Sequence, residues 1–170
     1  MLRRILLIGY VVIFGLSILS CAAEASGTKV GDFTLNDLDG NPVTISELDG
    51  LIILDFWATW CPPCKVEIPY LQSFHEEFGS KGLYVVGISN EQEPIQRKFI
   101  EDMKTDGVEI TYILLVDADG SVTREYGIRS IPTTIFVKPD LTQIEKEVGF
   151  RPEYAQKFRS IIEKNLPQER

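Results

Sequence analysis

The sequence predicts an α/β protein in which helices flank a central sheet. Apolar, β-prone runs alternate along the chain with segments whose apolar residues recur at helical spacing, which is typical of that class. The 170 residues correspond to one domain, long enough to bury a core without disulfide bonds. A composition of 44% hydrophobic and 25% charged residues is ordinary for a globular protein and argues against general disorder.

The first elements are a hairpin and a buried strand. Residues 33–35 and 43–45 alternate between apolar and polar side chains on either side of residues 39–41, whose Asp, Gly and Asn predict a turn. Residues 51–57 form an apolar run that only Asp55 interrupts, which indicates a central strand covered on both faces.

Two helices and two strands are expected next. The strands are the apolar runs 83–88 and 112–116. The first helix ends near Gly79, and Pro94 opens the second. The apolar positions that define their inner faces are Val66, Leu71, Phe74 and Phe78 in the first helix and Ile95, Phe99 and Met103 in the second.

A hairpin and a helix are expected to close the domain. Residues 133–137 and 144–148 have the pattern of paired strands. Pro152 stands near the start of an amphipathic helix. Its apolar residues are Tyr154, Phe158, Ile161, Ile162 and Leu166.

The first 21 residues have the pattern of a secretory targeting segment. Basic residues at 3–4 precede an uncharged stretch at 5–20, which as a helix would span about 24 Å, short of the roughly 30 Å core of a membrane. The three residues before Cys21 resemble the lipobox of bacterial lipoproteins. Residues 1–21 are expected to be a cleaved signal peptide, a lipoprotein signal with Cys21 as the lipidation site, or an uncleaved membrane anchor. Residues 22–29 then form a linker and 30–168 the domain, placed outside the cytoplasm and facing the periplasm or the cell exterior.

Charge and cysteine content exclude several classes of function. A net charge of −8 argues against binding to nucleic acid and to anionic lipid surfaces, so any hold on the membrane should come from the N-terminus. Three cysteines are too few for a disulfide framework, and the single histidine, His75, is too little for most histidine-based metal sites.

The chemical centre of the sequence is the pair Cys61 and Cys64, which follows the central strand and opens a helix. Two sulfurs three residues apart on a first helical turn can close a small ring, and unpaired N–H groups at the helix start favour a thiolate at the first sulfur. Pro62 and Pro63 carry no N–H, while the Cys64 N–H remains as a donor, so we expect a moderate lowering of the Cys61 pKa and a helix that begins at Pro63. The predicted chemistry is thiol–disulfide exchange.

Two structural roles for the cysteine pair are disfavoured. A zinc site would need two more ligands, and the chain offers one histidine and no other cysteine pair. A permanent disulfide between residues so close together would restrict little chain entropy. No metal and no other cofactor is therefore expected.

The sequence around the pair resembles thioredoxins. Residues 54–64 read LDFWATWCPPC, and residues 126–133 resemble the loop of that family that carries a cis-proline. Pro69 matches the proline that kinks the family's active-site helix. Glu67, the extra segment at 94–116, the N-terminal hairpin and the export signal are similar to the TlpA/ResA branch. The resemblance implies a thioredoxin fold, a mixed sheet flanked by helices, with an N-terminal β-hairpin and a central αβ insertion.

The resemblance also implies roles for individual residues. Cys61 would be the attacking thiolate and Cys64 the resolving thiol. Asp55 interrupts an apolar strand, so burial should raise its pKa, and it is our first choice as acceptor of the Cys64 proton. Glu67 is the second choice, with an exposed helical glutamate as the alternative.

Further residues are expected to bind substrate or to shape the site. Pro132 would follow a cis peptide bond, and the backbone of Ile131, in the same loop as Thr133, would pair with an extended substrate segment. Trp60 and Gly149 would flank the groove. The residues expected to shape the site are Trp57, Pro62, Pro63 and Pro69, with Trp57 packed in the core.

The resemblance implies a membrane-tethered, monomeric thiol-disulfide oxidoreductase that reduces protein disulfides. Apocytochrome c is one candidate substrate, and a membrane protein of the CcdA/DsbD type is the expected electron donor. One alternative is a thiol peroxidase of the AhpC/TSA type, although Leu54 and Ala58 stand where the peroxidase pattern has Pro and Thr or Ser. Another is a copper-handling or redox-inert binding module. A copper site would need a histidine beside the cysteine pair, whereas His75 is expected on the surface of the active-site helix.

Overall fold

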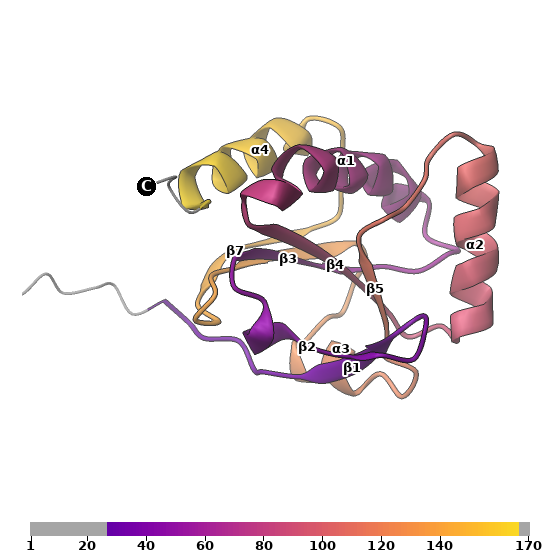
Figure 1. The fold of residues 1–170 in the computed structure, drawn as a ribbon, viewed down its shortest axis with the longest axis horizontal. Helices are drawn as coiled ribbons and strands as arrows, with labels where there is room; N and C mark the ends of the chain where they lie inside the picture. The colour runs from indigo at the N-terminus through magenta and orange to yellow at the C-terminus, as the bar shows by residue number, and fades with distance from the viewer. Residues whose placement is uncertain (1–26, 167–170) are drawn as a thin grey trace, which may run out of the picture.

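The computed structural model describes residues 27–166, so the predicted targeting segment and Cys21 lie outside the described residues. Helices flank one mixed sheet of seven strands, as predicted (Figure 1). The strands are β1 (Thr34–Asp37), β2 (Pro42–Thr44), β3 (Leu51–Phe56), β4 (Leu83–Ser89), β5 (Ile113–Val116), β6 (Thr133–Val137) and β7 (Gln143–Val148). The helices are α1 (Pro62–Phe78), α2 (Glu93–Thr105), α3 (Ser121–Glu125) and α4 (Tyr154–Asn165).

The sheet order is β2-β1-β5-β4-β3-β6-β7, which leaves β3 paired on both sides. β3 runs parallel to β4 and antiparallel to β6, and β4 runs parallel to β5. Every residue of β3 is buried, because helices or other segments cover both faces of the sheet at this strand. The predicted central strand is confirmed.

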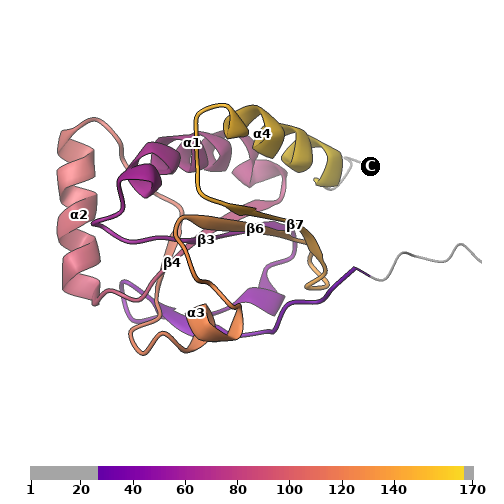
Figure 2. The same cartoon turned by 180° about the vertical axis from the view of Figure 1, so that it is seen from behind.

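Two hydrophobic cores lie on the two faces of the sheet. Ile53, Phe136 and Phe158 belong to the core under α1 and α4, whereas Leu54 and Phe56 belong to the core on the side of α3. Figure 2 shows α1 and α4 side by side on one face and α3 on the other. The alternation along β3 therefore assigns Asp55 to the face that α1 covers.

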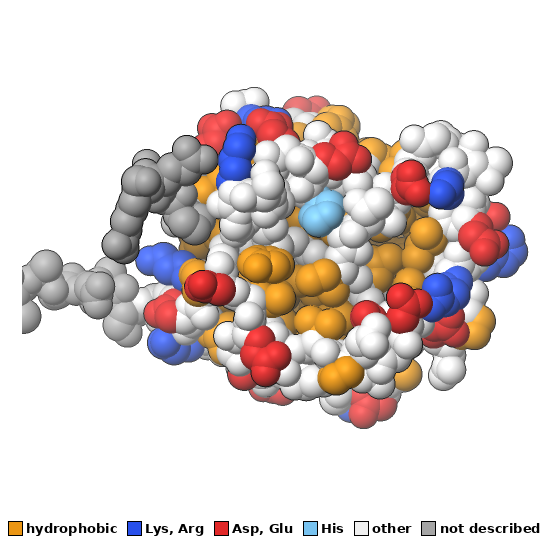
Figure 3. Space-filling view, in the orientation of Figure 1, with side chains coloured by type: hydrophobic (Ala, Val, Ile, Leu, Met, Phe, Trp, Pro, Cys, Tyr) orange, Lys and Arg blue, Asp and Glu red, His pale blue; other side chains and the backbone are white. Residues whose placement is uncertain are grey.

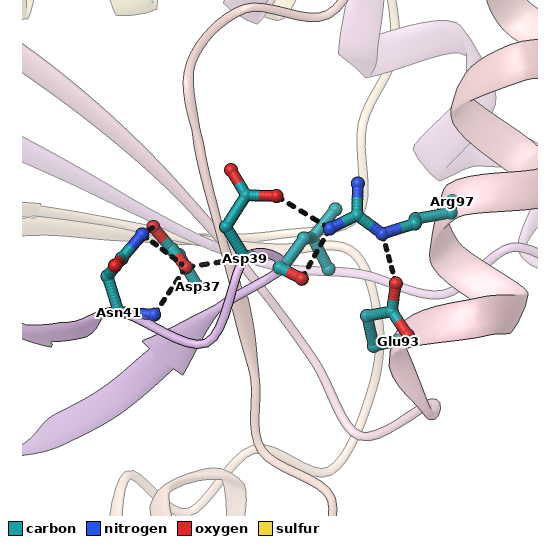
Figure 4. A network of polar contacts seen from close by, with 6 residues as sticks. Asp37, Asp39, Asn41, Glu93 and Arg97 are labelled. Carbon is teal, nitrogen blue, oxygen red and sulfur yellow. Dashed lines mark hydrogen bonds and ion pairs between the residues drawn. The ribbon is translucent and has the colours of Figure 1, made fainter.

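The predicted N-terminal hairpin is present as β1 and β2, and polar contacts fix both its turn and its place beside α2 (Figure 4). The Asp37 carboxylate accepts hydrogen bonds at 2.8 Å from the backbone N–H groups of Asp39 and Asn41. Arg97 of α2 donates to Asp39 at 2.7 Å and to Glu93 within its own helix. These contacts hold the hairpin against the inserted αβ segment.

Three details of the helices differ from prediction. α1 begins at Pro62, one residue earlier than expected, because a proline is tolerated in the first turn where its missing N–H has no partner. Val66, predicted for the inner face of α1, is 45% exposed, because Glu67 and Ile68 take the buried positions of that turn; α1 ends beside Gly79, as predicted. In α2 the predicted inner residue Ile95 is 48% exposed, because the buried position in that turn belongs to Gln96, whose amide donates to the Glu91 carbonyl.

Residues 28–29, close to the start of the described chain, lie along the β6–β7 hairpin. The backbone of Lys29 forms an isolated antiparallel β-bridge with Thr142, and the Gln143 N–H donates to the Thr28 carbonyl at 2.9 Å. Thr28 and Lys29 therefore pair with backbone groups that an edge strand would otherwise leave open. Within residues 27–166, none of the helices combines the length and the apolar character needed to cross a bilayer.

Candidate active site

The cysteine pair lies where β3 passes into α1. Cys61 and Cys64 form a disulfide with their Cα atoms 5.3 Å apart. Cys61 is the residue before the first turn of α1, and the Cys64 N–H donates to its sulfur at 3.2 Å, as the proline pattern predicts. Cys61 is 2% exposed and Cys64 is 1% exposed, so both sulfurs are nearly covered in this oxidised state.

The loop before Cys61 is held by hydrogen bonds to Glu91, which lies between β4 and α2. The Glu91 carboxylate accepts hydrogen bonds from the Thr59 backbone N–H at 2.6 Å and from the Thr59 hydroxyl at 2.8 Å. Trp60, the next residue, is 68% exposed and projects from a loop whose backbone is fixed. Sequence reasoning missed Glu91, because nothing in the pattern of residues 89–93 indicates which loop it contacts.

The cis-proline loop has the predicted conformation. The bond between Ile131 and Pro132 is cis, and Thr133 donates from its hydroxyl to the Ser130 carbonyl at 2.7 Å. The Gly149 N–H donates to the Pro132 carbonyl at 2.7 Å, and space is open where a side chain at Gly149 would point. The cis-proline loop and Gly149 are therefore adjacent, as they would be if both lined a substrate groove.

A cavity of about 400 Å³ opens next to this loop, where Trp60 and Ile131 lie on its wall. Arg129 is its one charged lining residue. The other residues that line it are Phe56, Trp57, Ile88, Asn90, Thr123, Ile128 and Ser130. Sequence reasoning did not predict Asn90 or Thr123 here, because β4 and α3 reach the cavity only through the order of strands in the sheet.

Two acidic side chains are buried on the α1 face of the sheet. Asp55 on β3 is 1% exposed, and Glu67, three residues after Cys64 on α1, has no exposed surface. The Thr134 hydroxyl donates to Glu67 Oε1 at 2.6 Å, which joins α1 to β6. Glu67 is thus a buried acid and not the exposed helical glutamate of the alternative prediction.

Burial changes the protonation of both acids. Desolvation, followed by the charge of Glu67, raises the pKa of Asp55 well above its ordinary value, as predicted. Desolvation raises the pKa of Glu67 to about 7, although the hydrogen bond from Thr134 opposes this shift. Near neutral pH the carboxyl group of Glu67 can therefore hold or release a proton, and burial favours the protonated form of Asp55.

The remaining predicted residues pack around the site. Trp57 is 2% exposed and its ring lies 5.2 Å from that of Phe99 on α2, so it belongs to the core, as predicted. Pro69 lies inside α1, and Pro62 and Pro63 are exposed at its start. His75 is half-buried, with its ring edge toward Tyr112. Among the described residues, no three His, Cys, Asp or Glu side chains gather as a metal site would require.

Comparisons with known proteins agree with this geometry. The family model described as AhpC/TSA matches residues 26–144. Thiol-disulfide oxidoreductase ResA of Oceanobacillus iheyensis is 35% identical over 119 residues, which cover 67% of this chain and 60% of that relative. The match thus spans about 60% of the relative's length.

Two solved structures share the fold. A thiol:disulfide interchange protein of the thioredoxin family from Chlorobium tepidum has a TM-score of 0.71 and 30% identity, covering 85% of this chain and 100% of that one. Peroxidoxin BcpB from Mycobacterium tuberculosis has a TM-score of 0.67 and 28% identity, covering 82% and 96%. The fold is thioredoxin-like, with the N-terminal hairpin and the αβ insertion in the predicted places.

Proposed function

The chain belongs to the AhpC/TSA family of the thioredoxin superfamily, and from this premise we propose that it is a thiol-disulfide oxidoreductase that reduces disulfide bonds in other proteins. The observation that carries the proposal is the disulfide between Cys61 and Cys64 at the start of α1. The names of the ResA and interchange-protein relatives support the same activity.

The proposed reaction has two exchange steps. In the reduced protein the Cys61 thiolate attacks one sulfur of a substrate disulfide, forms a mixed disulfide and releases the first substrate thiolate. Cys64 then loses its proton and attacks the Cys61 sulfur, which releases the second substrate thiolate. Two electrons pass to the substrate, and the protein returns to the Cys61–Cys64 disulfide.

The Cys64 proton needs an acceptor under the helix, since Cys64 is covered. We assign this role first to Asp55 and second to Glu67. Both carboxyl groups lie on the face of the sheet that α1 covers, and burial raises the pKa of each toward the range in which a carboxylate takes a thiol proton.

The cavity between Trp60 and Ile131 is the proposed groove for the substrate segment that carries the attacked disulfide. The Ile131 backbone, next to the cis bond, would pair with that segment as a short added strand. On the face shown in Figure 3, basic side chains lie among acidic ones, which does not favour binding of nucleic acid there.

We also propose that the domain works outside the cytoplasm, tethered through residues 1–21, and that it acts as a monomer. The Thr28 carbonyl accepts a hydrogen bond from the Gln143 N–H, next to the turn that joins β6 to β7. β6 begins at the cis-proline loop and runs five residues away from it, so Thr28 lies about 16 Å along the sheet from the groove. A tether at that end leaves the cysteine pair free to meet substrates and an electron donor of the CcdA/DsbD type.

A thiol peroxidase is the second candidate, because the family name and the likeness to Peroxidoxin BcpB both favour it. Leu54 and Ala58, in place of the residues of the peroxidase pattern, weigh against it. Rapid and saturable turnover of hydrogen peroxide by the purified full chain would reverse our ranking.

Reduction of insulin tests the proposed activity. The full chain with dithiothreitol should accelerate the precipitation of reduced insulin, and Cys61→Ser should abolish the acceleration. Cys21→Ser is the matched control, because it removes the one cysteine outside the pair and should leave the rate unchanged. Activity that survives Cys61→Ser would contradict the proposal.

A trap in cells tests the partners. Cys64→Ser cannot resolve the mixed disulfide, so Cys61 should hold its partner for mass spectrometry. Recovery of apocytochrome c or of a membrane electron donor would assign the pathway. Recovery of small-molecule thiols alone would count against a protein substrate.

A further inference from the structure

Several buried polar atoms without a hydrogen-bond partner lie in one region of the α1 face of the sheet. Both oxygens of Asp55, Oε2 of Glu67, Nε1 of Trp57 and the hydroxyl of Tyr112 are buried and unpartnered. Such groups are rare in folded proteins, and a cluster of them usually serves a function or holds ordered water. Tyr112 precedes β5 in the inserted segment, and neither the predicted site nor the proposed reaction uses it.

Gly87 shows that these side chains meet beside Asp55. It pairs with Asp55 in the register of β3 and β4, so both residues face α1. A Cβ atom at Gly87 would lie 3.0 Å from Nε1 of Trp57 and 3.3 Å from Cε2 of Tyr112. The ends of the indole and phenol rings therefore converge over a glycine that is the cross-strand neighbour of the acid.

The unpartnered donors and acceptors of this cluster are complementary. Among residues 27–166, the unpartnered buried side-chain atoms that can donate a hydrogen bond belong to Trp57, Tyr112 and His75, and Nδ1 of His75 lies beside Gly79, at the end of α1 away from Cys64. An ionised carboxylate can only accept, and Asp55 has no partner, whereas Glu67 already accepts from Thr134. Asp55 is therefore the acceptor that most needs these donors once it carries a charge.

We propose that Tyr112 is a positioning residue of the redox site, whose phenol O–H, together with the Trp57 indole N–H, donates through an ordered water to the Asp55 carboxylate. The proposal rests on the proposed thiol–disulfide exchange and deepens it. Without donors, burial would keep Asp55 protonated and unable to take a proton from Cys64. With them, Asp55 can be ionised before the resolving step and neutral after it.

Tyr112 keeps its own proton throughout. Burial, followed by the charges of Asp55 and Glu67, raises its pKa well above the ordinary value, so the phenol stays a donor at every pH of interest. His75 of α1 faces the same ring at 6.4 Å between centroids. On α1, Glu67 raises the pKa of Asp55 by its charge, and Glu147 of β7 acts on Glu67 in the same way; Cys61 and Cys64 belong to the core on this face. The aromatic side chains that α2 and α4 contribute to this core are Phe99 and Phe158, which do not titrate.

Titration of Asp55 in the reduced full chain, followed by carboxyl carbon NMR, tests the proposal without any substrate. Tyr112→Phe keeps the ring and removes the hydroxyl, and it should shift the titration of Asp55 upward by about one pH unit, the effect of losing a hydrogen bond to a charged group. The Asp55 signal is identified by its loss in Asp55→Asn. Tyr84→Phe is the control, because Tyr84 is half-buried and packs on the opposite face of the sheet.

A second measurement follows the resolving step. The pH at which Cys64 resolves a mixed disulfide at half its maximal rate should move upward in Tyr112→Phe and should not move in Tyr84→Phe. No shift, a downward shift, or equal shifts in both variants would overturn the role of Tyr112. Failure to reduce insulin would instead overturn the proposed function and leave the NMR titration as a separate result.

Discussion

Replacing Glu67 by glutamine should stabilise the oxidised protein above neutral pH. Glutamine keeps the length of the side chain and an oxygen that can accept from Thr134, whose hydroxyl lies 2.6 Å from Glu67. It removes the charge that the buried site disfavours. Asp55 is present in both proteins, and loss of the Glu67 charge lowers the pKa of Asp55, which acts in the same direction.

The expected magnitude follows from the pKa of Glu67, which burial raises from 4.5 to about 7. Below the lower value the carboxyl group is protonated in the folded and the unfolded chain, and its full contribution to stability is present. Between the two values only the folded chain keeps the proton, so stability falls as the pH rises. Above the upper value the loss is complete and amounts to about 3 kcal/mol.

Guanidinium unfolding of the oxidised protein, followed by tryptophan fluorescence, measures this effect. Wild type and Glu67→Gln should differ little near pH 4, and the variant should be more stable by about 3 kcal/mol near pH 8. Glu101→Gln, an exposed change on α2, is the control and should follow wild type at every pH. A difference between wild type and Glu67→Gln that does not grow with pH would refute the reasoning.

Three further changes test other parts of the structure. Phe136→Ala should lower the free energy of unfolding by about 3–5 kcal/mol in the same assay, because the ring is fully buried and packs on Phe158 at 5.1 Å. Arg97→Ala should leave the midpoint of thermal unfolding nearly unchanged, because its ion pairs are exposed. Glu91→Ala should slow insulin reduction about tenfold, with a smaller effect on unfolding, because it frees the Thr59 backbone before the cysteine pair. An unchanged rate would show that the loop holds its position without Glu91.

Local patterns predicted most of the fold. Residues 51–57 form β3 because a continuous apolar run suits a strand that is covered on both faces. The hairpin at 33–45 also follows from a local signal, since the Asp37 carboxylate organises its own turn. The error at Ile95 has a physical cause, because a tertiary hydrogen bond from Gln96 places a polar residue inward where periodicity favours an apolar one.

The site was predictable only in part, for a related reason. Cys61, Cys64 and the cis bond before Pro132 follow from two short motifs that carry their own geometry. Thr134 and Tyr112 could not be predicted, because their contacts depend on the order and register of strands far apart in the sequence. From the sequence pattern alone, Thr134 and Tyr112 cannot be distinguished from ordinary core residues.

The central claim is that Cys61 attacks substrate disulfides and Cys64 resolves the product. Mass spectrometry of the reduced full chain after exposure to a disulfide-linked peptide tests it most directly. Cys64→Ser should accumulate one peptide per chain on Cys61, wild type should return to the Cys61–Cys64 disulfide with no adduct, and Cys61→Ser should stay unmodified at Cys64. An adduct on Cys64 in Cys61→Ser that forms as fast as the adduct on Cys61 in Cys64→Ser would contradict the account.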